Sequence, residues 1–549
     1  MKLTMRPHLL FSALLLPLIV PPPVSAQVPA DAGTLVIATP AEAKSPVPTL
    51  WRNDQANREL SDLLFLHLAD LGPELNTAKE RSFLPRLARS WSRRDPTTLV
   101  FELDPRARWS DGTPVTGRDV LLAFERGRDP KLSPQLAVLL NRIQSVAAEG
   151  DHRVAVHFSE TYPEQMYDAV FHVAPLPAHL LATMPPESLG TSAFLAQPVG
   201  NGPYRLVRRV LGQLIELAAN PDFFLGAPKI HRVIFLIAGD AEARANLLLS
   251  GDADAIDNIY TLPNPGRLEH LPQFQYYPVP GLNVFYSLFN SRDPADSMRP
   301  HPLFSDAAVR RALVQSIDRV TLARQTYGSL STSPSAPVSA IVGRNVDAPA
   351  PLPYDTAAAR RGLARAGWAD HDGDGVLDKE GRALSLSILV PAPSMTRRAM
   401  ATKMQEAWRQ LGIQAQIDIA ERSVFSERRS GGRFDLVMDG VSQDPTPSGL
   451  SQSWSCAGIG GSNVAHYCNP RVDSLLALAP TARGGPERAW RDAVRIIAAD
   501  VPAIFIAAPV AFPAVHRRFT NVTLRPESTW SFVWQWSVRP GQQIDRDRP

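Results

Sequence analysis

The sequence predicts a mixed α/β fold, and three observations support this prediction. Segments with the two-residue alternation of β-strands are interleaved with segments that repeat apolar residues every three or four positions. The segment 400–419 reads as helix, glycine and strand, which is a unit typical of an α/β layer. The chain has 549 residues, 44% of them apolar, and is therefore long enough for two or three domains with sizeable cores.

Strand patterns occur along the whole chain. In the segment 153–158 the apolar residues Val154, Val156 and Phe158 occupy alternate positions, as expected for a half-buried strand. The other predicted strands are 34–38, 98–103, 233–237, 284–289, 384–390 and 413–420.

Three helices are predicted from their caps and apolar faces. The first begins with Ser305 as its cap and presents one apolar stripe. That stripe consists of Val309, Ala312, Leu313, Ile317 and Val320. The second is capped by Asp355 and ends at Gly367. The third ends at Gly412, and its apolar face consists of Met400, Met404, Trp408 and Leu411.

The segment 87–120 is the most characteristic part of the chain. It predicts a helix end, a turn, a strand, a hairpin and a helix start. Asp111 and Gly112 suit a tight turn, and Pro114 suits a rigid exit from it. Because the segment carries no nucleophile, metal cluster or phosphate loop, we expect it to be structural.

The first 26 residues have the pattern of a secretory signal peptide. Lys2 and Arg6 precede an apolar run over 9–20, and the small residues 24–26 form a cleavage site. The run is short for a transmembrane span, although a retained anchor is the alternative. No cysteine lies nearby for lipid attachment, so we expect a soluble periplasmic protein.

Charge and cysteine content narrow the function classes. The 57 basic and 54 acidic residues nearly balance, and no basic run is interleaved with aromatic residues, so we expect no nucleic-acid partner. Cys456 and Cys468 are the only cysteines, and in an oxidising compartment such a pair favours one disulfide, worth about 2–3 kcal/mol. Free or metal-bound thiols remain the alternatives, with His466 as the nearest histidine.

Several blocks, in the same order along the chain, resemble family 5 solute-binding proteins of ABC transporters, the dipeptide/oligopeptide-binding class. The blocks are 87–91, 101–103, 109–114, 119–120, 198–204, 220–224, 250–254, 306–319, 366–375, 434–435 and 461–473.

This resemblance implies a two-lobed periplasmic binding protein, class II-like, with an extra small domain and a ligand cleft between the lobes. Lobe I is expected to comprise 27–50, 190–275 and 505–549, the extra domain 51–189, and lobe II 276–504. The implied partners are the permease and ATPase subunits of an ABC importer and a small peptide or similar solute. A monomer without a cofactor is expected.

The resemblance also implies ligand-binding residues. Asp444 falls where dipeptide- and oligopeptide-binding members grip the peptide ammonium, since a buried carboxylate needs a cation. A structural role, capping the loop before Pro445, is the alternative for Asp444. Those members have a tryptophan at the position of Val441, so this chain lacks an aromatic pocket wall there. A non-peptide ligand, such as an opine, a glutathione-like compound, a metal complex or an oligosaccharide, is therefore the second hypothesis.

Three more residues are candidates for the ligand pocket. Trp51 and Trp454 are candidate pocket walls, and each of them could equally belong to the core. Arg429 could bind a ligand carboxylate, although a solvated surface arginine is the favoured interpretation. In the dipeptide-like subclass the pair corresponding to Cys456 and Cys468 is bridged, which strengthens the predicted disulfide.

The acidic loop 370–378 resembles part of a calcium loop. Asp370, Asp372, Asp374 and Asp378 occupy four ligand positions of that pattern. Position 12 is Gly381 instead of the bidentate glutamate, so an ordinary helix-to-strand connection is favoured.

Enzyme motifs are lacking from the sequence. It contains no G-x-S-x-G, H-E-x-x-H, G-x-x-x-x-G-K or G-x-G-x-x-G pattern, so we do not expect an enzyme. A secreted hydrolase or a chaperone is the less favoured alternative.

Overall fold

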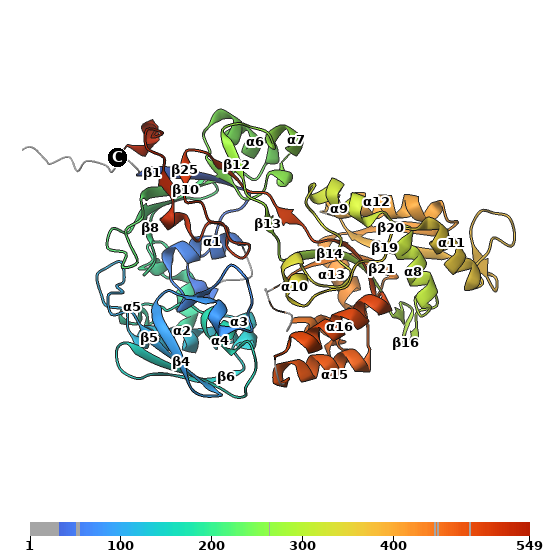
Figure 1. Ribbon diagram of the computed structural model, residues 1–549, viewed down its shortest axis with the longest axis horizontal. Helices are drawn as coiled ribbons and strands as arrows, with labels where there is room; N and C mark the ends of the chain where they lie inside the picture. The colour runs from blue at the N-terminus through green and yellow to red at the C-terminus, as the bar shows by residue number, and fades with distance from the viewer. Residues whose placement is uncertain are drawn as a thin grey trace, which may run out of the picture.

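The structure is a computed structural model that describes residues 32–50, 55–262, 264–392, 394–443, 446, 449–482 and 485–548. It has two α/β bodies that are joined by extended segments (Figure 1). The first body contains a seven-stranded and a four-stranded sheet, and the second contains a five-stranded sheet. This arrangement confirms the predicted two-lobed α/β fold. We call the body with the five-stranded sheet lobe II, the seven-stranded part of the other body lobe I, and the four-stranded part the extra domain.

Lobe I is built on the strand order β12-β24-β11-β1-β10-β9-β8. Its central strand β1 pairs in parallel with β10 and β11, and both β1 and β10 were predicted. The strands are β1 (Gly33–Thr39), β8 (Tyr204–Val210), β9 (Leu214–Ala219), β10 (Ile230–Ile237), β11 (Ala255–Ile256), β12 (Phe274–Tyr276) and β24 (Ala514–His516). The helices are α1 (Gln55–Leu64), α6 (Ala241–Ser250) and α7 (Pro265–Leu268), and the ladder β25 (Phe519–Thr520) with β26 (Ser537–Val538) lies near the C-terminus.

The extra domain has the antiparallel order β4-β5-β7-β6. Its strands are β2 (Ala69–Leu71), β3 (Phe83–Pro85), β4 (Ala88–Asp95), β5 (Thr98–Leu103), β6 (Ile143–Ala148) and β7 (Arg153–Phe158), with β2 paired to β3. Its helices are α2 (Gly117–Gly127), α3 (Pro134–Leu139), α4 (Gln165–Val170) and α5 (Ala178–Leu181). Apolar side chains of lobe I and the extra domain form one continuous core.

The helix end that we predicted after residue 87 is wrong, because this segment is the edge strand β4. Its side chains are mostly exposed, so the strand lacks the apolar alternation that marks a half-buried strand in sequence. Pairing with β5 along its whole length holds β4 in the sheet.

In the remainder of the characteristic segment 87–120, Trp109 and Ser110 contact other parts of the same body. Trp109 is buried with its ring edge against Phe65, and the backbone of Ser110 donates a hydrogen bond to Gly200. Gly200 lies so close to the carbonyl of Leu64 that a Cβ would overlap it, which explains the glycine. The two most recognisable sequence blocks of this part of the chain therefore contact each other.

Lobe II has the order β20-β19-β21-β14-β22. The strands are β14 (Asn283–Phe289), β19 (Ser385–Pro391), β20 (Gln414–Ala420), β21 (Leu436–Ser442) and β22 (Ala503–Ala507). The helices are α8 (Ala307–Gln315), α9 (Arg319–Tyr327), α10 (Ala340–Asn345), α11 (Thr356–Arg365), α12 (Met395–Arg409), α13 (Arg422–Ser430), α14 (Leu450–Trp454), α15 (Pro470–Leu478) and α16 (Glu487–Asp500). Two short ladders, β15 (Arg292–Asp293) with β16 (Asp296–Pro300) and β17 (Asp378–Lys379) with β18 (Arg382–Ala383), project from it. Separate apolar clusters cover the two faces of the sheet.

The helix predicted from Ser305 is two helices. Asp306, not Ser305, caps α8 by accepting a hydrogen bond from the amide of Ala308 at 2.7 Å. The chain turns at Asp318, whose carboxylate caps α9 through the amide of Thr321. Val320 then lies on an exposed face instead of the predicted apolar stripe. The other two helices are confirmed, since Asp355 caps α11 and the predicted apolar face of α12 is buried.

Two antiparallel segments connect the lobes. Strand β13 (Val279–Pro280) leaves lobe I and pairs with β23 (Val510–Ala511), which returns after the lobe II strand β22. In Figure 1 this ladder lies between the two bodies. In the described part of the chain, no helix combines the length and the apolar character needed to span a bilayer.

Buried charges fix the two chain ends of lobe I to each other. Arg518, with 2% of its side chain exposed, pairs with Asp254 at 3.0 Å and with Asp547 at 2.6 Å, and both carboxylates are 1% exposed. The guanidinium also donates to the carbonyl of Thr34 at 2.6 Å, while Asp547 accepts the amide of Thr34 at 2.7 Å. Strand β1, the turn before β11 and the C-terminal segment therefore meet at Arg518.

Candidate functional site

The end of strand β21 and the loop after it form the region in which the sequence places the ligand. Gln443 anchors the start of this loop to lobe II. Its amide donates to the carbonyl of Leu282 at 3.0 Å, and its side chain accepts from the amide of Ser339 at 2.7 Å and donates to the carbonyl of Pro337 at 2.6 Å. The first residues of the loop are thus held rigidly by three contacts.

Two of the predicted site residues, Asp444 and Trp51, lie outside the described residues, so their roles stay predictions. Val441 lies in β21 opposite Val284 of β14. It is half-buried and packs against the apolar cluster on one face of the lobe II sheet. Its role as a pocket wall also stays a prediction.

Trp454 lies in the core of lobe II. Only 4% of the residue is exposed, and its ring meets those of Tyr286, Tyr467 and Phe505 at centroid distances of 6.2, 6.1 and 5.8 Å. Of the two roles that the sequence left open, this placement favours packing, because the aromatic faces of Trp454 are covered by its own lobe.

Arg429 is engaged by a partner within lobe II. Its Nε and a terminal nitrogen lie 2.7 and 2.6 Å from one carboxylate oxygen of Asp439. The Asp439 side chain is 8% exposed, whereas that of Arg429 is 32% exposed. A buried carboxylate needs a cation nearby, so Arg429 compensates the charge of Asp439 and is not simply solvated.

The loop after β21 reaches the extra domain through Thr446. The hydroxyl of Thr446 donates to Glu164 Oε1 at 2.8 Å, and Glu164, just before α4, is 4% exposed. Burial raises the pKa of Glu164 to about 7, the Thr446 hydroxyl lowers it, and nearby Asp168 raises it. Glu164 is thus a buried acid at a contact between the extra domain and lobe II.

A second contact between the bodies involves Tyr260. Its hydroxyl lies 3.2 Å from Ser329 Oγ and accepts the amide of Ser329 at 3.4 Å. On the lobe I side its ring lies 5.6 Å from that of Phe512. Gly328, which ends α9 with a φ of 101°, touches the ring so closely that a Cβ would overlap it. Glycine is therefore required at this point of lobe contact.

Two further contacts join the extra domain to lobe II. Asn345 Nδ2 donates to the carbonyl of Leu75 at 3.3 Å, and Lys79 Nζ lies 3.5 Å from a carboxylate oxygen of Glu487. In the described part of the chain, these polar contacts join the bodies at several places besides the β13–β23 ladder. The residues of these contacts are not predicted from the sequence, because no local pattern indicates a partner in the other body. Gly328 alone carries a local signal, since a glycine commonly ends a helix.

The contact between Glu164 and Thr446 predicts a pH dependence. Separation of the two bodies would return water to Glu164 and lower its pKa toward the ordinary value, so we expect the form in which they touch to hold the proton more tightly. A pKa that is raised in this form stabilises it as the pH falls. As the pH falls from about 8 to about 5.5, we therefore expect the ligand affinity to rise several-fold. Isothermal titration calorimetry measures this change.

The variant Glu164→Gln should bind with the low-pH affinity across this range. The charged groups facing Glu164 are Asp168, which accepts from Tyr162 at 2.7 Å and lies 3.3 Å from His172, and Arg142. The control Glu160→Gln changes an exposed carboxylate that pairs with the same Arg142. Equal pH dependence in the Glu164→Gln variant and the unchanged protein would contradict the assignment.

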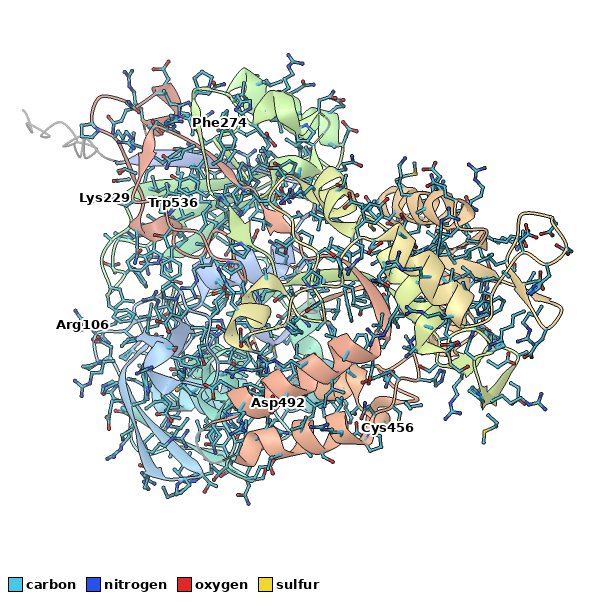
Figure 2. All side chains as sticks on the ribbon, turned by 45° about the vertical axis from the view of Figure 1, so that its right-hand side comes forward. Arg106, Lys229, Phe274, Cys456, Asp492 and Trp536 are labelled. Atoms are coloured by element: carbon cyan, nitrogen blue, oxygen red, sulfur yellow. A yellow bond between two sulfur atoms is a disulfide. The ribbon has the colours of Figure 1, made fainter. Side chains whose placement is uncertain are left out.

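The predicted disulfide between Cys456 and Cys468 is confirmed. Cys456 lies beside the α15–α16 helix pair of lobe II (Figure 2), and its amide donates to Asp473 of α15 at 3.0 Å. Asn463 crosses the loop that the bond closes, donating to the carbonyls of Ser455 and Tyr467 at 2.8 and 2.7 Å. The bond thus fixes a loop that follows α14.

The acidic loop forms an exposed group of three carboxylates, Asp370, Asp372 and Asp374. Their oxygens accept backbone amides of the loop itself, such as those of Gly373 at 2.7 Å and Val376 at 2.7 Å. The loop connects α11 to the β17–β18 ladder, which agrees with the predicted helix-to-strand connection.

Comparison with known proteins identifies the family. Residues 82–461 match the family of bacterial extracellular solute-binding proteins, family 5. Oligopeptide-binding protein AppA of Bacillus subtilis (strain 168) is 25% identical over 528 residues, covering 93% of both chains. A probable di/tripeptide-binding protein 5 of Pseudomonas aeruginosa (strain UCBPP-PA14) is 25% identical over 539 residues, covering 91% of this chain and 94% of that protein.

Solved structures agree in fold. AppA from Bacillus subtilis in complex with a nonapeptide aligns with a TM-score of 0.72 at 24% identity, covering 93% of this chain and 99% of that one. NikZ from Campylobacter jejuni in complex with Ni(L-His) aligns with a TM-score of 0.71 at 22% identity, covering 92% and 99%. With a family match across more than half of its length and the two-lobed fold, this chain belongs to the bacterial extracellular solute-binding proteins of family 5.

Proposed function

We propose that this protein is the solute-binding component of an ABC importer and that it captures peptides between its two lobes. The observation that carries the proposal is the likeness to an oligopeptide-binding protein over 93% of both chains. The contacts between the bodies support a mechanism in which ligand bridging both lobes favours a closed form. The closed protein, exported as a monomer to the periplasm, would deliver the peptide to a permease driven by ATPase subunits. No catalytic step is part of this proposal.

Isothermal titration calorimetry with a defined set of di- and tripeptides and longer peptides tests the proposal. We expect saturable binding of at least one peptide class with one site per chain. Absence of binding to every peptide, together with binding of a non-peptide solute, would contradict the peptide assignment while retaining the transport role.

A metal complex is the second candidate ligand. The similar fold of NikZ in complex with Ni(L-His) and the absence of an aromatic residue at Val441 favour this candidate. Nickel with histidine therefore belongs in the same titration series. Saturable binding of that complex, without peptide binding, would select it.

Asp444 is the residue that we propose to bind the ligand ammonium. Asp444→Ala should weaken peptide binding by at least about tenfold, because removing a charge-assisted hydrogen bond in a desolvated site costs more than 1.4 kcal/mol. Asp374→Asn removes an exposed carboxylate of the same lobe and should leave the affinity unchanged. An unchanged affinity of the Asp444 variant would assign this residue to the loop-capping role.

A further inference from the structure

A cavity of about 240 Å³ opens in lobe II, and its described lining residues do not include the loop after β21. Residues from α8, α9, α16, β22 and the segment 335–352 line it. Its volume is several times the about 30 Å³ that one water molecule takes up in the liquid, so a small solute fits. Three arginines and no acidic residue are among the described residues that line it.

Arg319 forms the buried wall of this cavity. It is 5% exposed, and its guanidinium donates to the carbonyls of Phe505 at 3.2 Å and Leu352 at 2.5 Å. Within the described part of the chain it makes no ion pair. Burial lowers the pKa of Arg319 to about 10, because no charged group offsets the lost hydration. A guanidinium has five N–H groups, so donors remain beyond the two carbonyl contacts.

A second residue that lines the same cavity, Ser335, carries a buried oxygen. The hydroxyl oxygen of Ser335 is inaccessible to solvent and has no hydrogen-bond partner among the described residues. A buried hydroxyl without a partner costs on the order of 1–3 kcal/mol. A buried cation that has no counter-ion among the described residues is the feature of this cavity that favours an anionic ligand.

The other two arginines lie nearer to solvent. Arg311 of α8 is exposed and donates to the carbonyl of Ala499 at 2.5 Å. Arg495 of α16 is 53% exposed and lies 3.3 Å from a carboxylate oxygen of Asp347, itself 69% exposed. Two cations at the opening attract an anion, and the buried Arg319 offers it a desolvated partner.

We propose that this lobe II cavity binds a small oxyanion, with Arg319 as its buried partner and Arg311 and Arg495 at the opening. Guanidinium groups match planar carboxylates and tetrahedral phosphates through paired hydrogen bonds, which is the chemistry shared by both classes. The proposal is independent of the ligand that binds between the lobes.

Calorimetric titration with inorganic phosphate, sulfate and acetate at constant ionic strength tests the proposal. We expect saturable binding of one anion per chain and a rise of the melting temperature with its concentration. Preference for phosphate and sulfate indicates a tetrahedral anion, and preference for acetate a carboxylate; either supports the oxyanion assignment. Chloride keeps the ionic strength constant in these titrations. If none of the three anions binds saturably even in molar excess over the protein, the proposal is overturned.

Variants locate the site. Arg311→Gln and Arg495→Gln should each weaken anion binding by about tenfold, and Arg319→Gln should abolish it. Arg319 also donates hydrogen bonds to two backbone carbonyls, so Arg319→Gln can fail to fold. In that case the Arg311 and Arg495 variants still test the proposal. The matched control is Arg491→Gln. Arg491 lies one turn from Arg495 on α16, and its Nε is 3.7 Å from a carboxylate oxygen of the same Asp347, but it does not line the cavity. An equal loss in the Arg491 variant would overturn the proposal.

Discussion

Replacing Arg518 by methionine is expected to lower the free energy of unfolding by about 3–5 kcal/mol. The change removes from Asp547 the only cation that pairs with it among the described residues, and it leaves Asp254 with the partly exposed Arg546 at 2.6 Å; both carboxylates are 1% exposed. It also removes the hydrogen bond to the carbonyl of Thr34. Breaking a buried pair from one side costs far more than an exposed pair contributes, because the remaining charge stays desolvated.

Urea unfolding followed by tryptophan fluorescence measures this effect. Arg548→Met is the matched control, since Arg548 and its partner Asp545 have side chains 82% and 99% exposed and lie 3.7 Å apart. Such exposed pairs contribute about 0–1 kcal/mol, so the control should unfold like the unchanged protein. Should Arg518→Met fail to fold, Asp547→Asn provides a milder test. A loss below about 1 kcal/mol in both variants would contradict the role of this network.

Gly328→Ala is expected to weaken ligand binding by at least about tenfold. Its φ of 101° and ψ of 159° lie in a region that costs other residues on the order of 1–3 kcal/mol. A Cβ at this position would also overlap the Tyr260 ring of lobe I. Separation of the lobes relieves this overlap, so the substitution favours the open form and reduces the population that retains ligand.

Titration calorimetry with the peptide identified for the unchanged protein measures the affinity, and small-angle X-ray scattering measures the opening. Gly362→Ala is the control, because a Cβ on this α11 glycine meets open space and should leave binding unchanged. In the double variant Tyr260→Ala with Gly328→Ala, the overlap is gone, so affinity should recover partly. Equal affinity of Gly328→Ala and the unchanged protein would contradict the closure role. The scattering readout stands even if the ligand is not a peptide.

Local signals in the sequence were sufficient for many elements of the fold. Asp355 and Gly367 delimit α11 correctly because capping and helix termination depend on neighbouring backbone groups alone. The apolar face of α12 is buried as expected, since its spacing matches one side of a helix. Strand β4 is not apparent from the sequence because its exposed polar residues carry no strand period, and only its partner β5 places it in a sheet.

The candidate site was less accessible to sequence reasoning. Arg429 and Trp454 were selected by residue type, and the structure gives them partners within lobe II. Glu164 was not selected, although it is buried and contacts the loop after β21, because its partner Thr446 lies 282 residues away in the chain. Residue type alone does not reveal such a partner.

The sequence by itself determined the family, the alternation of strands and helices and the disulfide pair, because these depend on short motifs and on the chemistry of single residue types. Only the tertiary structure decided which charges meet. Arg518 reaches Thr34 across 484 residues, and Tyr260 meets Ser329 across the two bodies. Such contacts arise from how distant segments pack, and packing of this kind leaves no periodic signal in the sequence.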